Sequence, residues 1–93
     1  MSKTYQVELT RTAQKQVLAL PGKIRRQIEA TIDRLEATLN EGRRPQDIKP
    51  IKGEPHAYRI DSGEYRVLFY LDDDTAKVVI GQVLHRKDAY RNL

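Results

Sequence analysis

The chain has 93 residues, of which 39% are hydrophobic and 32% charged, and its formal net charge is +4. That length predicts one domain over residues 1–93, and the lack of a long apolar run or an apolar leader argues against a membrane span and a signal peptide, so we expect a cytoplasmic protein. Because the chain has no cysteine and only two separated histidines, we expect no disulfide, no metal and no cofactor, whereas the basic charge suits a polyanion or an acidic protein as partner.

The first half of the chain predicts one strand and two helices. Residues 4–10 alternate between apolar and polar side chains, which is typical of a strand. Thr10 can cap a short helix over 11–20, and Pro21-Gly22 then interrupts the chain. A second helix is predicted over 23–39, because its apolar residues recur every three or four positions and form one stripe: Ile24, Ile28, Ile32, Leu35 and Leu39.

The second half predicts a long loop followed by three strands. Residues 40–55 are rich in Gly and Pro and indicate a loop, and a loop of this length often has a binding role. Strand-like runs follow at 56–60, 64–71 and 76–84, and the chain closes with a polar tail. Strands joined by short turns pair antiparallel, and two consecutive helices can cover only one face of their sheet. We therefore predict an α+β domain of order β-α-α-β-β-β, with a small twisted antiparallel sheet, a helical hairpin on one face and an open basic face.

The stretch YRIDSGEYR, residues 58–66, places an arginine directly after a tyrosine on both sides of Ser62-Gly63. A two-residue turn there would set Arg59 opposite Arg66, although like charges in direct opposition destabilise a sheet. A three-residue loop would instead set Arg59 opposite Tyr65. We favour the first register. In the second of these strands the alternate residues that are more uniformly apolar should meet the helices, which leaves Arg59 and Arg66 on the open face.

The candidate functional residues supply the groups that metal-free RNA cleavage needs. In that reaction a 2′-hydroxyl loses a proton, a 5′-oxygen gains one, and negative charge on the phosphorane must be stabilised. The planar fork of arginine matches phosphate oxygens, whereas His and Tyr can move protons or stack on a base. The candidates are Arg59, Arg66, His85, Arg86 and Tyr90. Taken singly, each is also an ordinary surface cation or strand aromatic.

Three stretches carry a family resemblance: LPGKIRRQI (20–28), IKGEPHAYRIDSGEYRVLF (51–69) and VLHRKDAYR (83–91). With the element order, they resemble the RelE/ParE superfamily of bacterial toxin–antitoxin toxins, and the RelE branch in particular. The resemblance implies a toxin that enters the ribosomal A site and cleaves the mRNA there by 2′-hydroxyl attack, leaving a 2′,3′-cyclic phosphate. It also implies a RelB-like antitoxin as partner, besides the ribosome and its mRNA, with DNA contacted only through the antitoxin.

The resemblance also implies roles for the candidate residues. Arg59 would position the substrate, and Arg66 and Arg86 would stabilise charge on the phosphate. His85 would act as general base or acid, and Tyr90 would stack on the base or share in proton transfer. Contacts to RNA or to the ribosome are expected from four further cations: Lys49, Lys52, Lys87 and Arg91.

One position departs from the family pattern, and two other functions stay open. Some members of the family have a lysine where this chain has Asp61, so either fewer cations serve here or His85 takes over proton transfer. The ParE branch shares the fold but inhibits DNA gyrase without cleaving nucleic acid. A non-catalytic basic module would bind rRNA or an acidic partner. The HRKDAYR ending and the two hairpin arginines favour the RelE branch.

Overall fold

The computed structural model describes residues 4–92, with the side chains of residues 4–89. The elements follow one another in the order β1 (Gln6–Leu9), α1 (Arg11–Leu18), α2 (Gly22–Asn40), β2 (Ile48–Pro50), β3 (Ala57–Ser62), β4 (Tyr65–Asp72), β5 (Lys77–His85) and α3 (Arg86–Asn92). No helix in this described part is long and apolar enough to cross a membrane.

Local sequence accounts for the two helices that follow β1. Oγ1 of Thr10 accepts a hydrogen bond from the Ala13 N–H at 3.1 Å, so Thr10 caps α1 as predicted. α2 begins directly after Pro21, the N-cap residue, whose carbonyl oxygen accepts a hydrogen bond from the Arg25 N–H at 2.9 Å. The apolar stripe of α2 faces the sheet, with four buried residues: Ile28, Ile32, Leu35 and Leu39. Because the stripe is single, the helix can cover only one face of the sheet.

The five strands form one mixed sheet in the order β1-β5-β4-β3-β2. β1 runs parallel to β5, and the other neighbouring strands are antiparallel. The predicted α+β class is thus confirmed, but the prediction of an antiparallel sheet is wrong in one pair. The exception is possible because β1 and β5 are not consecutive: two helices and three strands lie between them, so no tight hairpin forces them to run antiparallel.

Two elements lie where the sequence predicted irregular chain. The predicted loop over 40–55 contains β2, which pairs with β3 along the sheet edge. This strand ends at Pro50, a residue that cannot donate to a ladder and is tolerated at an edge. The predicted polar tail forms the helix α3, which begins directly after β5.

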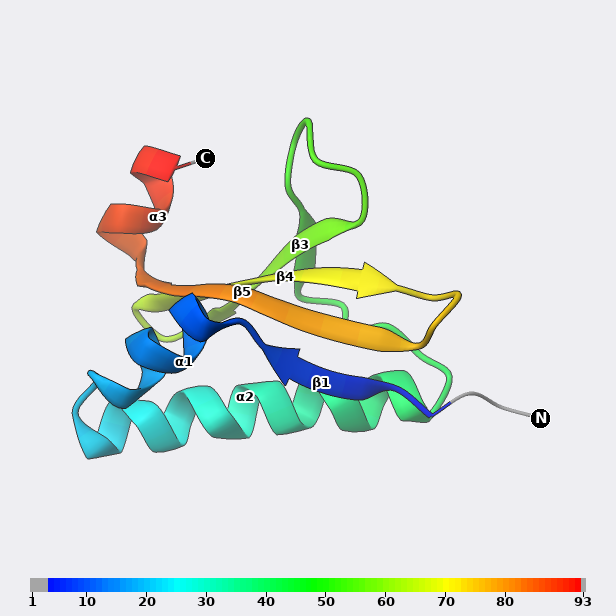
Figure 1. Ribbon diagram of the computed structural model, residues 1–93, viewed down its shortest axis with the longest axis horizontal. Coiled ribbons are helices and arrows are strands. Elements are labelled where there is room, and N and C mark those ends of the chain that lie inside the picture. The colour runs from blue at the N-terminus through cyan, green and yellow to red at the C-terminus, as the bar shows by residue number, and fades with distance from the viewer. Residues whose placement is uncertain (1–3, 93) are drawn as a thin grey trace.

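α1 and α2 lie together on one side of the sheet, while α3 and the loop after β2 rise on the other side (Figure 1). In β4 the predicted alternation is confirmed. Val67, Phe69 and Leu71 face the helices and are at most 2% exposed. The intervening residues of β4, which include Arg66, face the open side.

A β-bulge lies between β4 and β5. Leu68 pairs with Gln82 and Phe69 with Ile80, so Gly81 is an extra residue on β5. The bulge shifts the alternation of β5, and Ile80 and Val83 consequently both reach the core although they are three residues apart.

The turn of the β3–β4 hairpin differs from both predicted forms. Ser62 pairs with Tyr65, so the two turn residues are Gly63 and Glu64. Gly63 has a φ of +58°, and a positive φ at the first turn position is what a type II′ turn requires. Ser62 is buried because α2 holds it: Nε2 of Gln27 donates to its carbonyl oxygen at 2.8 Å.

The prediction that Arg59 faces Arg66 is therefore wrong. Arg66 lies opposite Asp61, and Arg59 lies opposite Leu68. This register places opposite charges together and avoids the direct repulsion of two arginines. The partner of Arg66 differs from the predicted one by two positions, and a shift of two leaves every side chain on its own face. Both arginines remain on the open face, as predicted.

Candidate functional site: a cationic cluster on the open face

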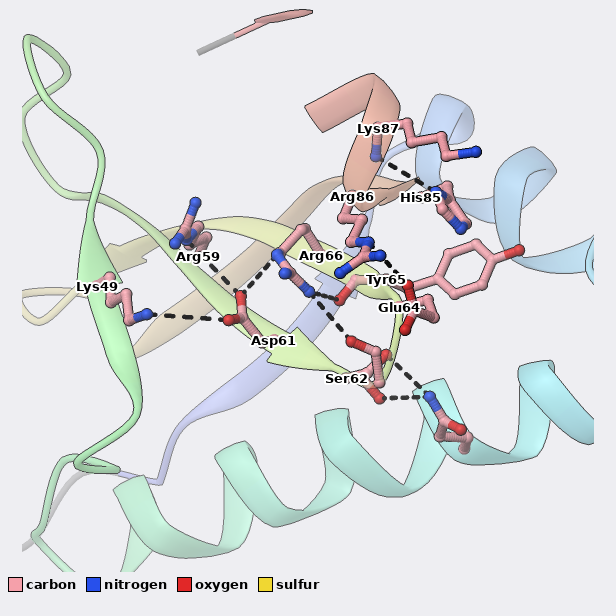
Figure 2. Close-up of polar contacts among 12 residues, drawn as sticks. Lys49, Arg59, Asp61, Ser62, Glu64, Tyr65, Arg66, His85, Arg86 and Lys87 are labelled. Carbon is pink, nitrogen blue, oxygen red and sulfur yellow. Dashed lines mark hydrogen bonds and ion pairs between the residues drawn. The ribbon is translucent and has the colours of Figure 1, made fainter. Parts of the chain in front are cut away.

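Three cations surround one carboxylate on the open face of the sheet (Figure 2). Oδ1 of Asp61 lies 3.1 Å from Nε of Arg66 and 3.7 Å from Nε of Arg59. Oδ2 of Asp61 lies 3.9 Å from Nζ of Lys49 on β2. We call these four residues the Asp61 cluster. Its net charge is +2, because three cations share one anion.

Strand pairing explains why these side chains meet. Arg59 and Asp61 are two residues apart on β3, so both project from the same face. Arg66 pairs with Asp61 across the hairpin, and Lys49 pairs with Arg59 across the β2–β3 ladder. The like charges in direct opposition are thus Lys49 and Arg59, and the neighbouring Asp61 carboxylate offsets their repulsion.

Burial falls across the cluster from the middle of the sheet to its edge. The side chain of Arg66 is 10% exposed, that of Arg59 19%, that of Asp61 36% and that of Lys49 59%. Nη1 of Arg66 donates to the carbonyl oxygens of Gly63 at 3.2 Å and of Tyr65 at 3.0 Å. Arg66 is therefore fixed by the hairpin turn as well as by Asp61.

The ion pairs of the cluster balance charge without completing its hydrogen bonds. Among the described side chains, three buried atoms have no hydrogen-bond partner: Nε of Arg59, Oδ1 of Asp61 and Nε of Arg66. The contact of 3.1 Å between Asp61 and Arg66 is therefore an ion pair in which the N–H is not aligned with the oxygen. Since buried polar groups in native proteins are nearly always hydrogen-bonded, the two arginine N–H groups can serve a further acceptor.

Two hollows that share a lining residue lie near the cluster, and only the first is lined by cluster residues. One, of about 270 Å³, is lined by Arg59 and by a run of β2 and the following loop: Lys49, Pro50, Ile51 and Lys52. The second, of about 260 Å³, shares Ile51 with the first and extends over β4 and β5 past Leu68, Tyr70 and Gln82. Tyr70 is 49% exposed. Cations beside the first hollow suit a phosphate backbone, and an exposed aromatic ring beside the second suits an unpaired base.

Arg86 is tied to the hairpin turn that precedes Arg66. Its backbone N–H donates to the carbonyl oxygen of Glu64 at 2.7 Å, and its Nε lies 2.8 Å from Oε2 of Glu64. Both side chains are more than half exposed. The pair places the first residue of α3 at the end of the hairpin from which Arg66 projects.

His85 does not join the Asp61 cluster. It pairs with Tyr65 in the β4–β5 ladder, and cross-strand partners share a face of the sheet. Tyr65 has the same parity in β4 as the buried Val67, so Tyr65 and His85 lie on the helical face. Their rings meet edge to face with centroids 5.3 Å apart. Nδ1 of His85 accepts a hydrogen bond from the backbone N–H of Lys87 at 3.3 Å, which links this ring to the start of α3.

The remaining predicted binding residues are spread around this region. Lys52 lines the first hollow, and the side chain of Lys87 is exposed on α3. Tyr90 and Arg91 belong to α3, but their side chains lie outside the described part of the structure.

The sequence alone did not identify Asp61 and Glu64 as parts of the site. Asp61 stood out only as a departure from the family pattern, although an arginine and a carboxylate two residues apart on one strand indicate a shared face. Glu64 carried no comparable signal, because its contact with Arg86 depends on a turn position that was predicted wrongly.

Residues 7–90 match the family model described as the ParE toxin of the type II toxin–antitoxin system parDE. The chain is also 34% identical over 84 residues to Toxin RelE3 of Methanocaldococcus jannaschii, and the match covers 90% of this chain and 93% of that protein. This chain belongs to the RelE/ParE superfamily of toxins from type II toxin–antitoxin systems.

Several solved structures similar to this chain are toxins in complex with antitoxins. The RelBE2 toxin–antitoxin complex of Mycobacterium tuberculosis contains a chain with a TM-score of 0.73 and 29% identity, and the match covers 90% of this chain and 100% of that one. The RelB–RelE complex of Methanococcus jannaschii contains one with a TM-score of 0.69 and 32% identity, covering 91% of this chain and 96% of that one. Among these relatives the RelE toxins are therefore well represented.

Proposed function

We propose that this toxin is a ribosome-dependent endoribonuclease that cleaves mRNA in the A site. The observation that carries the proposal is the Asp61 cluster, a set of arginine and lysine side chains on the sheet face opposite α1 and α2, with Arg86 at the neighbouring hairpin end. In the proposed reaction the 2′-oxygen attacks the adjacent phosphorus and loses its proton. The bond from phosphorus to the 5′-oxygen breaks, the 5′-oxygen gains a proton, and a 2′,3′-cyclic phosphate remains.

The cations have distinct parts in this proposal. Arg66 and Arg86 stabilise the charge that develops on the phosphorane, and Arg59 positions the scissile phosphate beside them. Fixed donors directed at developing charge are commonly the largest single contribution to catalysis. The hydrogen bonds from Arg66 to the turn carbonyls support such a part, since they hold its guanidinium in place before the substrate arrives.

The role proposed for His85 differs from the one that the resemblance implied. Its ring lies on the helical face, away from the Asp61 cluster, and its Nδ1 accepts from the start of α3. We propose that His85 is a positioning residue that sets the first turn of α3 and thereby Arg86. Tyr90 keeps its proposed part in stacking on the base or in proton transfer.

The partners in the proposal are an antitoxin, the ribosome and its mRNA. The two similar structures described above are toxin–antitoxin complexes of the RelBE type, which supports a RelB-like antitoxin for this chain. Four cations outside the proposed catalytic set would contact RNA or the ribosome: Lys49, Lys52, Lys87 and Arg91. An antitoxin that covered this basic face would block these contacts.

A second candidate function is inhibition of DNA gyrase, and the description of the matching family model as a ParE toxin favours it. The two functions separate in one pair of assays with the purified toxin. The proposal predicts cleavage of mRNA on programmed ribosomes, at positions in phase with the A-site codon, and unchanged DNA supercoiling by gyrase. Inhibited supercoiling with intact mRNA would instead make the protein a gyrase inhibitor.

A further inference from the structure

The Asp61 carboxylate occupies the place where the proposed reaction needs a phosphate. It lies among Arg59, Arg66 and Lys49, and no other anion contacts these three cations in the described part of the chain. A carboxylate and a phosphodiester are alike here, because each offers two oxygens that share one negative charge. The cluster is thus already filled by an anion of the chain itself.

The fit of this carboxylate is incomplete, and that points to a second occupant. The N–H groups at Nε of Arg59 and of Arg66 are buried and have no hydrogen-bond partner. The Arg66 side chain is nine-tenths buried and has its Nε directed toward the cluster (Figure 2). Buried donors without a partner are rare in native proteins, and a ligand oxygen that aligned with these two N–H groups would supply the missing acceptor.

The Asp61 carboxylate also has room to move toward Lys49. Its side chain is 36% exposed, and its Oδ2 already lies 3.9 Å from Nζ of Lys49, which is 59% exposed at the sheet edge. A carboxylate that turned toward Lys49 would keep one cation and release the two arginines. The first hollow provides space for this movement beside Lys49 and Arg59, which both line it.

We propose that Asp61 is a built-in competitor for the RNA phosphate. The inference rests on the proposed function, since it takes the Asp61 cluster as the RNA site. In the free toxin Asp61 balances the two arginines and keeps them oriented. On binding, a phosphodiester displaces the carboxylate toward Lys49 and takes over Arg59 and Arg66. The competition lowers the affinity for RNA alone, so productive binding depends on the further contacts that the ribosome supplies.

The test compares the binding of an uncleavable RNA by variants of matched charge. The probe is a short single-stranded oligonucleotide with 2′-O-methyl riboses, and binding is followed by fluorescence anisotropy at fixed salt. Asp61→Asn removes the competitor, Asp61→Glu retains its charge, and Asp33→Asn makes the same charge change on the exposed surface of α2. We expect Asp61→Asn to bind at least about fivefold more tightly than Asp33→Asn, because a charge at contact distance acts far more strongly than a distant one. Asp61→Glu should bind like the wild type.

Equal affinities of Asp61→Asn and Asp33→Asn would overturn the proposal. If Asp61→Asn folds poorly, the melting temperature gives a second test: inorganic phosphate should raise it more for Asp61→Asn than for Asp33→Asn, at equal ionic strength. Equal shifts would also overturn the proposal. Neither measurement requires cleavage. If the wild-type toxin leaves ribosome-bound mRNA intact, the proposed function is wrong. If Asp61→Asn binds RNA no more tightly than Asp33→Asn, only the proposal that Asp61 competes with the phosphate is wrong.

Discussion

Asp61 stands directly opposite Arg66 in the β3–β4 ladder, with its Oδ1 3.1 Å from Nε of the arginine. Arg59, two residues before Asp61, approaches the same oxygen at 3.7 Å. Opposite charges therefore face each other across the hairpin, whereas the predicted register set Arg59 against Arg66. Arg66 consequently has two roles: it stabilises the hairpin, and it faces the proposed RNA site.

Arg66→Lys separates charge from geometry at this position. Lysine keeps the positive charge but lacks the planar fork with which Arg66 reaches Gly63 O, Tyr65 O and Asp61 together. We expect a loss of about 1–3 kcal/mol in the free energy of unfolding, measured by urea denaturation. The rate of mRNA cleavage on ribosomes should fall at least about tenfold, because fork geometry matches phosphate oxygens. Arg26→Lys on the exposed surface of α2 is the control. If Arg66→Lys had the stability and the cleavage rate of the wild type, both expectations would be contradicted.

Arg86 can be compared with Arg34 on α2, which makes a similar ion pair but belongs to the helical layer on the other side of the sheet. The Arg86–Glu64 contact is 2.8 Å with side chains 52% and 61% exposed, and the Arg34–Asp47 contact is 2.9 Å with side chains 50% and 49% exposed. Replacing either arginine by alanine should lower the free energy of unfolding by less than about 1 kcal/mol, as is usual for exposed pairs. Only Arg86→Ala should slow mRNA cleavage, by about 10²-fold, because only Arg86 faces the phosphate in the proposal. Equal cleavage rates in the two variants would remove Arg86 from the catalytic set.

His85→Asn tests whether His85 positions α3 or moves a proton. Asparagine can keep an acceptor near the place of Nδ1, toward the Lys87 N–H, while it removes the titratable ring. We expect the rate of mRNA cleavage to stay within about threefold of the wild type, with an unchanged dependence on pH, whereas general acid–base residues contribute about 10²–10⁴-fold. His85→Ala, which also removes the acceptor, should lose more activity than His85→Asn. A loss of 10²-fold or more in a folded His85→Asn variant would return His85 to the catalytic residues.

The sequence predicted which face each strand residue occupies better than it predicted strand register. Alternation in β4 assigned Val67 and Phe69 to the core, and that assignment depends only on neighbours along the chain. The position of the turn depends on contacts with α2. Ser62 is held by Gln27 and by Thr31, whose Oγ1 lies 2.7 Å from Ser62 Oγ, and both partners are distant in sequence. No local pattern could reveal that anchor.

Short elements escaped prediction for a related reason. β2 has three residues, one of them Pro50, so it is too short to show alternation, and pairing with β3 alone defines it. α3 reads as a polar tail because Ala89 is its one buried residue among those whose side chains are described. Both elements border the proposed site. The edges of the proposed site could therefore not be predicted from the sequence, although the sequence did place its central arginines, Arg59 and Arg66, on the open face.

The stability of the fold should depend on pH through Asp73, which lies outside the site. The Tyr5 hydroxyl donates to Oδ1 of Asp73 at 2.7 Å, and Nη2 of Arg44 lies 2.6 Å from Oδ2. The hydrogen bond from Tyr5, followed by the charge of Arg44, lowers the pKa of Asp73 below its ordinary value although partial burial opposes the change. A lowered pKa in the folded state stabilises the protein above the unfolded pKa of about 3.9, and this contribution disappears as the pH falls through the folded pKa.

The melting temperature of Asp73→Asn should accordingly lie below that of the wild type at pH 7, and the difference should shrink as the pH falls below about 3.9 and vanish once the pH is below the lowered pKa of the folded state. At pH 7 the difference should correspond to less than about 1 kcal/mol, since both charged side chains are about half exposed. The same hydrogen bond raises the pKa of Tyr5, so its contribution is complete below about pH 10 and is lost at higher pH. A difference that stayed constant from pH 7 to pH 3 would show that the Asp73 charge does not stabilise the fold.

The central claim is that the arginines on the open face bind the phosphate at which mRNA is cut. The most direct test maps the 3′ ends of mRNA on programmed ribosomes after incubation with the wild-type toxin and with Arg59→Gln. We predict that the wild type cuts within the A-site codon and leaves a 2′,3′-cyclic phosphate, and that a folded Arg59→Gln variant cuts at least about 10²-fold more slowly. Cleavage by Arg59→Gln at the wild-type rate would contradict the claim, as would intact mRNA in the presence of the wild-type toxin.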